Sequence, residues 1–145
     1  MKHNLLLVNA NFYDHISSML ITGAVKEIEK HQDLNYDILN VSGALEIPSV
    51  INMSLHGQRK YDGYIALGCV IRGETTHYDM VCEFSFKGLS DLAIKHNLAI
   101  GYGLLTVENE AQALVRADIN QKNKGGFAVN ACLELIKLKE YFYIY

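Results

Sequence analysis

The sequence predicts an α/β domain built on a mainly parallel β-sheet with helices covering both faces. Short apolar runs rich in β-branched residues alternate with amphipathic helical segments, which implies crossover connections between parallel strands. One run, residues 64–70, is nearly all apolar or small, as expected of a central strand buried on both sides. A chain of 145 residues, half of them apolar, is expected to form one domain over residues 1–145.

Each predicted element follows from a local pattern. The four apolar runs predict strands at residues 5–10, 36–41, 64–70 and 99–105. Apolar side chains at helical spacing predict helices at residues 15–31, 49–55, 76–97, 109–117 and 125–141. The second helix is expected to have Pro48 in its first turn and to end before Gly57. The predicted inward faces are Ile16, Leu20, Gly23 and Ile28 in the first helix and Val81, Phe84, Gly88 and Leu92 in the third.

The composition argues against several classes of protein. A net charge of -3 with no basic stripe does not favour nucleic-acid binding. Cys69, Cys82 and Cys132 are too few and too widely spaced for a disulfide framework or a metal-binding Cys-x-x-Cys pair. No segment stays apolar long enough to cross a membrane, and no glycine fingerprint for a dinucleotide is present. We therefore expect a cytoplasmic protein without a metal or an organic cofactor.

The carboxyl ends of the predicted strands are where a ligand should bind, because in such folds the loops converge there. The post-strand segments are residues 11–13, 42–46, 71–77 and 106–109. Residues 73–77 lead directly into a long helix, so unpaired backbone N–H groups and the threonine hydroxyls suit a phosphate monoester. An equally simple interpretation is that Thr75 or Thr76 only caps the helix.

His77 is the one histidine of six that coincides with such a loop, and its imidazole can give and take protons near neutral pH. Phe12 suits stacking on a flat heterocycle or covering the first helix. Glu46 suits a polyol or simply a helix amino terminus. Arg116 and Lys124 suit phosphate recognition, although such residues are more often solvated. Cys69 is expected to be a core residue rather than a nucleophile.

Taken together, these segments resemble the lumazine synthase family along nearly the whole chain. The matching motifs are residues 43–48 (GALEIP), 66–79 (ALGCVIRGETTHYD), 103–106 (GLLT) and 123–125 (NKG). The resemblance implies a flavodoxin-like three-layer sandwich with a four-stranded parallel sheet. It also implies a transferase of riboflavin biosynthesis, which condenses 5-amino-6-(D-ribitylamino)uracil with 3,4-dihydroxy-2-butanone 4-phosphate and releases phosphate and water.

The same resemblance implies a role for each site residue. His77 would be the proton donor, and Phe12 would stack on the pyrimidine. The pyrimidine and its ribityl chain would contact Ala44, Leu45, Glu46, Cys69, Val70 and Ile71. The phosphate would be held by Glu74, Thr75 and Arg116. Family sites lie between subunits, so the residues expected to reach across an interface are Tyr102, Arg116 and Lys124.

The chain departs from the common family pattern at several positions. Leu45 and Tyr102 stand where phenylalanine is usual, Tyr13 replaces a frequent asparagine, and Glu74 puts a carboxylate in the phosphate loop. The first strand begins almost at Met1, which favours a homopentamer over an icosahedral shell. Two alternatives remain open at this stage: a pentameric riboflavin synthase, which needs no phosphate site, and a noncatalytic flavin or lumazine carrier.

Overall fold

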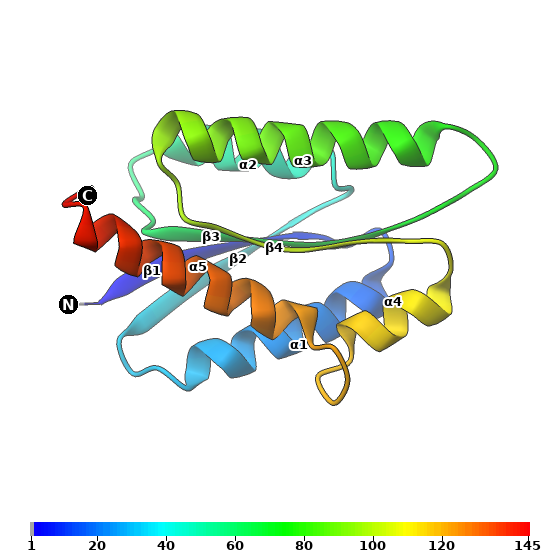
Figure 1. Ribbon diagram of the computed structural model, residues 1–145, viewed down its shortest axis with the longest axis horizontal. Helices are drawn as coiled ribbons and strands as arrows, with labels where there is room; N and C mark the ends of the chain where they lie inside the picture. Colours follow the sequence, from blue (N-terminus) through cyan, green and yellow to red (C-terminus); the bar gives the residue numbers. More distant parts are fainter. Residues whose placement is uncertain (1) are drawn as a thin grey trace.

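The computed structural model describes residues 2–145 and has three layers (Figure 1). Met1, the first residue of the predicted domain range, lies outside the described residues. The middle layer is a sheet whose strands are His3–Ala10 (β1), Leu34–Val41 (β2), Gly63–Ile71 (β3) and Ile100–Val107 (β4). The strand order is β2-β1-β3-β4, and every pairing is parallel. The predicted flavodoxin-like three-layer α/β sandwich is thereby confirmed.

Helices form the two outer layers. They are Asp14–Glu29 (α1), Glu46–Leu55 (α2), His77–His96 (α3), Glu110–Ala117 (α4) and Lys124–Tyr141 (α5). Figure 1 shows α2 and α3 on one face of the sheet and α1, α4 and α5 on the other. The two chain ends lie at the end of the sheet where β1 begins. The loops that follow the strands lie at the opposite end, beyond the carboxyl ends of the strands.

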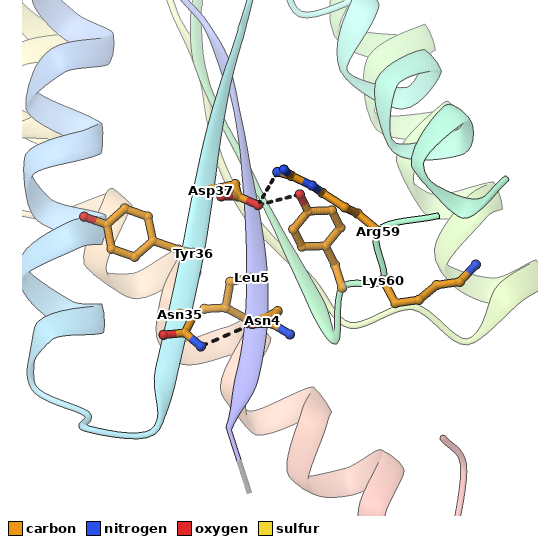
Figure 2. A pocket seen from close by; sticks show the side chains of 8 residues that line it. Asn4, Leu5, Asn35, Tyr36, Asp37, Arg59 and Lys60 are labelled. Atoms are coloured by element: carbon orange, nitrogen blue, oxygen red, sulfur yellow. Dashed lines mark hydrogen bonds and ion pairs between the residues drawn. The ribbon is translucent and has the colours of Figure 1, made fainter. Parts of the chain in front are cut away.

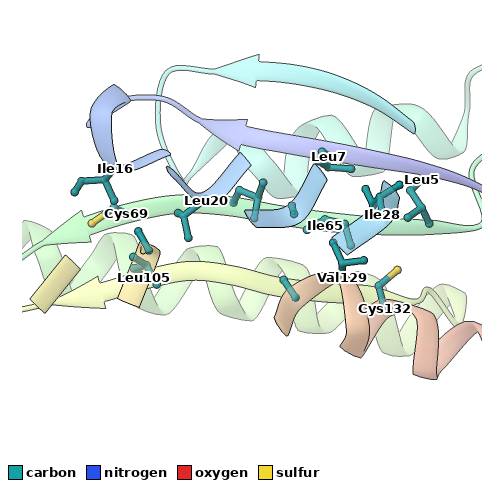
Figure 3. Close-up of a cluster of buried hydrophobic side chains, with 14 of the residues drawn as sticks. Leu5, Leu7, Ile16, Leu20, Ile28, Ile65, Cys69, Leu105, Val129 and Cys132 are labelled. Atoms are coloured by element: carbon teal, nitrogen blue, oxygen red, sulfur yellow. The ribbon is translucent and has the colours of Figure 1, made fainter. Parts of the chain in front are cut away.

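Two apolar clusters hold the layers together, one on each face of the sheet. Figure 3 shows the first, in which Leu5 and Leu7 of β1 pack against Leu20 of α1 and Val129 of α5. The second lies under α2 and α3 and takes Leu6 and other residues from β1, β3 and β4. Successive strand side chains point to opposite faces, so β1 and β3 are buried on both sides. The run at residues 64–70, predicted to be a central strand, lies in β3, which has a strand on each side.

The edge strand β2 is different, because most of its residues are exposed. Tyr36, Ile38 and Leu39 are large apolar side chains, and each remains more than a third exposed. One side of β2 pairs with β1 along its whole length, from Leu34 opposite His3 to Val41 opposite Ala10. The other side of β2 has no strand beside it within residues 2–145.

Several predicted boundaries were wrong by one to three residues. The second helix begins at Glu46 rather than Ser49, and α1 ends at Glu29 rather than His31. Strand pairing lengthens the sheet, since Thr106 and Val107 pair with Val70 and Ile71 instead of starting a loop. The predicted end of α3 at Asn97 was one residue late: the helix ends at His96, because Asn97 takes the left-handed conformation (φ 54°) that ends many helices.

The predicted inward face of α3 was also partly wrong. Phe84 is 52% exposed, whereas Ser85 is fully buried and donates a hydrogen bond from its hydroxyl to the Val81 carbonyl, 2.5 Å away. That bond satisfies the hydroxyl inside the layer, so a polar residue occupies a position where an apolar one was expected. In α1, by contrast, the predicted inward residues are all buried.

Candidate functional site

The strand order fixes where a site can form. The chain passes from β1 to β2 on one side and from β3 to β4 on the other, so the direction of winding changes between β1 and β3. Loops diverge at such a switch point and leave a crevice outside the carboxyl ends of the strands. Phe12 follows β1 and residues 72–76 follow β3, so both segments border this point.

The connection between β3 and α3 is open to solvent. Residues 72–77 are all exposed, and His77 is the first residue of α3. The Thr75 hydroxyl accepts a hydrogen bond from the His77 backbone N–H at 3.2 Å, whereas Thr76 makes no side-chain cap. The Thr75 bond is a local turn to the first residue of the helix, and the N-cap residue Thr76 makes no side-chain bond, so neither threonine caps α3 in the expected way. The next N–H groups of the first turn lack carbonyl partners within the helix. An anion placed there would face both those donors and the positive end of the helix.

Arg72, which sequence reasoning did not single out as a site residue, is the most heavily engaged side chain in this connection. Its Nε donates to Glu108 Oε2 at 2.8 Å, and its Nη1 lies 3.4 Å from the Asp79 carboxylate. The guanidinium also lies over the Tyr78 ring, 4.3 Å from the centroid. With two carboxylates around it, Arg72 is already paired and does not present a free charge to a phosphate.

Phe12 and the connection between β2 and α2 provide the surfaces predicted for a ring and a polyol. Phe12 is 72% exposed and meets Tyr13 edge to face, with ring centroids 4.9 Å apart. Glu46, now the first residue of α2, accepts a hydrogen bond from the Ser42 hydroxyl at 2.9 Å. Ala44 is buried and Leu45 is 45% exposed, so Leu45 is the apolar side chain that this connection offers.

The end of β3 contributes backbone more than side chains. Cys69 belongs to the cluster on the α1 face, whereas Val70 packs against the cluster under α2 and α3. Ile71 is the last strand residue and is only partly buried. Burial raises the pKa of the Cys69 thiol to about 11, which keeps it protonated and unreactive near neutral pH. The expectation that Cys69 is a core residue is in agreement with this environment.

Three predicted residues are not brought to this edge within one chain. Tyr102 lies inside β4 and stacks on Phe86, with centroids 5.9 Å apart. Arg116 lies in the last turn of α4, half-buried, and donates to the Gln112 carbonyl at 3.1 Å. Lys124 opens α5, and its Nζ is 5.5 Å from the Phe127 ring centroid. Since α4 and α5 cover the face opposite α3, Arg116 and His77 belong to different layers of the protomer (Figure 1).

Two hollows in the described part of the chain lie away from the predicted site. Figure 2 shows one of about 320 Å³ near the beginnings of β1 and β2, where Asp37 accepts from the Tyr61 hydroxyl at 2.6 Å and pairs with Arg59 at 3.5 Å. The other, about 550 Å³, lies near His3 and the end of α5. Neither contains a residue predicted for the site.

Comparison with known proteins identifies the group to which this fold and these motifs belong. The sequence model of 6,7-dimethyl-8-ribityllumazine synthase matches residues 2–140. The chain belongs to the 6,7-dimethyl-8-ribityllumazine synthase family. A family member from Bartonella henselae is 53% identical over 142 residues, covering 97% of this chain and 91% of its own. Another, from Agrobacterium fabrum, is 48% identical over 96% of both chains.

Membership of the lumazine synthase family makes the chain an enzyme and agrees with the resemblance inferred from its motifs. Within residues 2–145, no helix is both long and apolar enough to span a bilayer. The same residues contain no cluster of three or more His, Cys, Asp or Glu side chains arranged to hold a metal ion.

Proposed function

We propose that this enzyme makes 6,7-dimethyl-8-ribityllumazine by condensing 5-amino-6-(D-ribitylamino)uracil with 3,4-dihydroxy-2-butanone 4-phosphate, in riboflavin biosynthesis. The observation that carries the proposal is the exposed start of α3 at the switch point, where amide donors and the His77 imidazole occur together. Family membership supplies the reaction type, because the product is named in the family's description.

The phosphate of the ketone is expected to bind where residues 73–75 enter α3. Thr75 and the backbone N–H groups provide donors, and the exposed Glu74 side chain is free to turn toward solvent. Arg116 would add a guanidinium, which suits bidentate contact with phosphate. Its present bond to a backbone carbonyl leaves other N–H groups of the guanidinium available.

The pyrimidine is expected to lie between Phe12 and the ends of β2 and β3. The exposed Phe12 ring offers a flat face for stacking, and Glu46 is an acceptor for ribityl hydroxyls. The ring edge would meet the backbone of residues 69–71 and the small side chain of Ala44. Leu45 covers the ring with an aliphatic side chain, so the enzyme would lack one stacking partner common in the family.

The chemistry needs no nucleophile from the enzyme. The amine of the pyrimidine attacks the ketone, water leaves to form an imine, phosphate is eliminated, and the ribityl-bearing nitrogen closes the ring with loss of a second water. The enzyme supplies positioning, worth up to roughly 7 to 11 kcal/mol, and proton transfer, worth about 10² to 10⁴ in rate. His77 is the group expected to move protons at the carbonyl and imine.

A complete site is expected to require two copies of the chain. Arg116 and His77 lie in opposite helical layers of one protomer, so a site that uses both takes Arg116 from a neighbour. Tyr102 and Lys124 would approach from the same neighbour. The exposed apolar residues of β2 are further candidates for burial between copies. A closed ring of five is the assembly that we propose.

The test is product formation by the purified enzyme. With both substrates present, we expect lumazine fluorescence to appear together with inorganic phosphate, and omission of either substrate should abolish both signals. Production of riboflavin from added lumazine would instead identify a riboflavin synthase. Tight lumazine binding without turnover of the two substrates would identify a carrier. Either result would overturn the proposed reaction.

A further inference from the structure

We propose that Arg72 is a positioning residue, which sets the geometry of the phosphate-binding connection and of His77 by tying three elements together. The proposal rests on the proposed function, because it assigns the connection between β3 and α3 to the ketone phosphate. Arg72 itself is not expected to contact the substrate, since its guanidinium is already shared by Glu108 and Asp79.

The first step concerns which elements meet at Arg72. Its backbone N–H donates to the Val107 carbonyl at 2.9 Å, which continues the pairing of β3 with β4 by one residue. Its side chain reaches Glu108, the residue after β4, as well as Tyr78 and Asp79 in the first turn of α3. One residue therefore joins the ends of two strands to the start of the helix that bears His77.

The second step concerns the partner Glu108, which is itself fixed. Its backbone N–H donates to the Gln112 side-chain oxygen at 2.8 Å, and the Gln112 carbonyl accepts from Arg116 at 3.1 Å. Gln112 is also held at the start of α4, because its N–H donates to the Asn109 side chain at 2.9 Å. Arg72 is thus bonded to a residue whose backbone is itself tied to the first turn of α4.

The third step concerns what Arg72 does for the loop. Residues 73–76 are exposed, and their one side-chain hydrogen bond joins Thr75 to the His77 backbone, while the Thr76 carbonyl accepts from the Met80 N–H at 3.2 Å. A guanidinium that lies over the Tyr78 ring and is bonded to Asp79 contacts two successive residues of the first helical turn and so restrains it. Loss of these contacts should let the turn fray and displace the amide donors and the imidazole. A displacement of about 1 Å at reacting groups can lower a rate by up to about 100-fold.

The experiment compares Arg72→Met with wild type in the full-length assembled enzyme. We expect faster amide hydrogen exchange in residues 74–79, a lower kcat, a higher KM for the phosphorylated ketone and a KM for the pyrimidine within about twofold of wild type. Arg72→Lys keeps the charge but loses the planar fork, so it should restore only part of the activity. Lys87→Met is the matched control, because it breaks an exposed ion pair with Asp91, 2.8 Å long, elsewhere on α3.

The outcomes separate this proposal from the proposed function. Wild-type lumazine formation decides the reaction by itself, whereas hydrogen exchange in the Arg72→Met protein needs no turnover. Unchanged exchange in residues 74–79 would overturn the positioning role even if the wild type makes lumazine. Equal increases in both KM values, or the same kinetic change in Lys87→Met, would also overturn it, since a general loss of structure would explain them.

Discussion

The role proposed for His77 follows from its position at the start of α3. It is exposed, it is the first residue of α3, and its backbone N–H is bonded to the Thr75 hydroxyl. An imidazole at such a helix start lies beside amide donors that suit an anion, so under the proposed function we expect it to lie close to the bonds that change near the phosphate.

Replacing His77 by Ala should lower kcat by about 10² to 10⁴ with much smaller changes in both KM values, because proton transfer matters chiefly in the transition state. His96→Ala is the matched control, since His96 is the exposed last residue of the same helix. Steady-state kinetics on the two variants provide the comparison. A raised KM with wild-type kcat in His77→Ala would contradict the assignment.

The buried thiols of Cys69 and Cys132 should make the free energy of unfolding depend on pH in alkaline solution. Burial raises the pKa of Cys69 to about 11 and that of Cys132 to about 12, from a reference of 9.0. Above about pH 9 the unfolded thiols lose protons that the folded ones keep, so the free energy of unfolding should fall by up to about 1.4 kcal/mol per pH unit for each thiol.

Urea unfolding at pH values from about 8 to about 9.5, where most tyrosines are still protonated, measures this slope. Cys132→Ala should be less stable throughout that range because it leaves a cavity, yet its stability should fall less steeply with pH. An unchanged slope in Cys132→Ala would show that the thiol does not ionise on unfolding.

At the scale of elements, close packing of α5 on β4 depends on a glycine. A Cβ at Gly101 would collide with the backbone carbonyl of Ala128 in α5. A backbone atom cannot swing aside as a side chain can, so Gly101→Ala must push the helix away from the sheet.

We expect Gly101→Ala to lower the free energy of unfolding by roughly 1 to 3 kcal/mol, with the loss visible as an earlier urea midpoint. Gly57→Ala is the control, because a Cβ there would lie at ordinary contact distances, 3.6 Å or more from its nearest neighbours. Equal midpoints for Gly101→Ala and wild type would mean that α5 tolerates the extra methyl group.

The sequence predicted the order and type of the nine elements found in residues 2–145, because burial on both faces gives apolar runs and helices give periodic ones. It missed features that depend on neighbours in space. Thr106 and Val107 are strand residues because β3 pairs with them. The network around Arg72 was missed for the same reason, since Glu108 is 36 residues away.

At the scale of the whole molecule, the proposed sharing of sites can be tested with two inactive proteins. Chains carrying His77→Ala and chains carrying Arg116→Ala should each be nearly inactive alone. Unfolding, mixing and refolding them together should restore activity to about a quarter of wild type, because about one interface in four then has both native groups. No recovery, with mixed assemblies confirmed by native mass measurement, would place both groups in one protomer.

The exposed edge strand β2 affects how a single, newly made protomer should behave. Its outer side offers unpaired backbone groups, and its side chains Tyr36, Ile38 and Leu39 are exposed. Such an edge is a template for indiscriminate pairing with any extended chain. If the proposed pentamer uses this strand, its assembly would compete with aggregation, and a charged residue at Leu39 should favour single protomers over both.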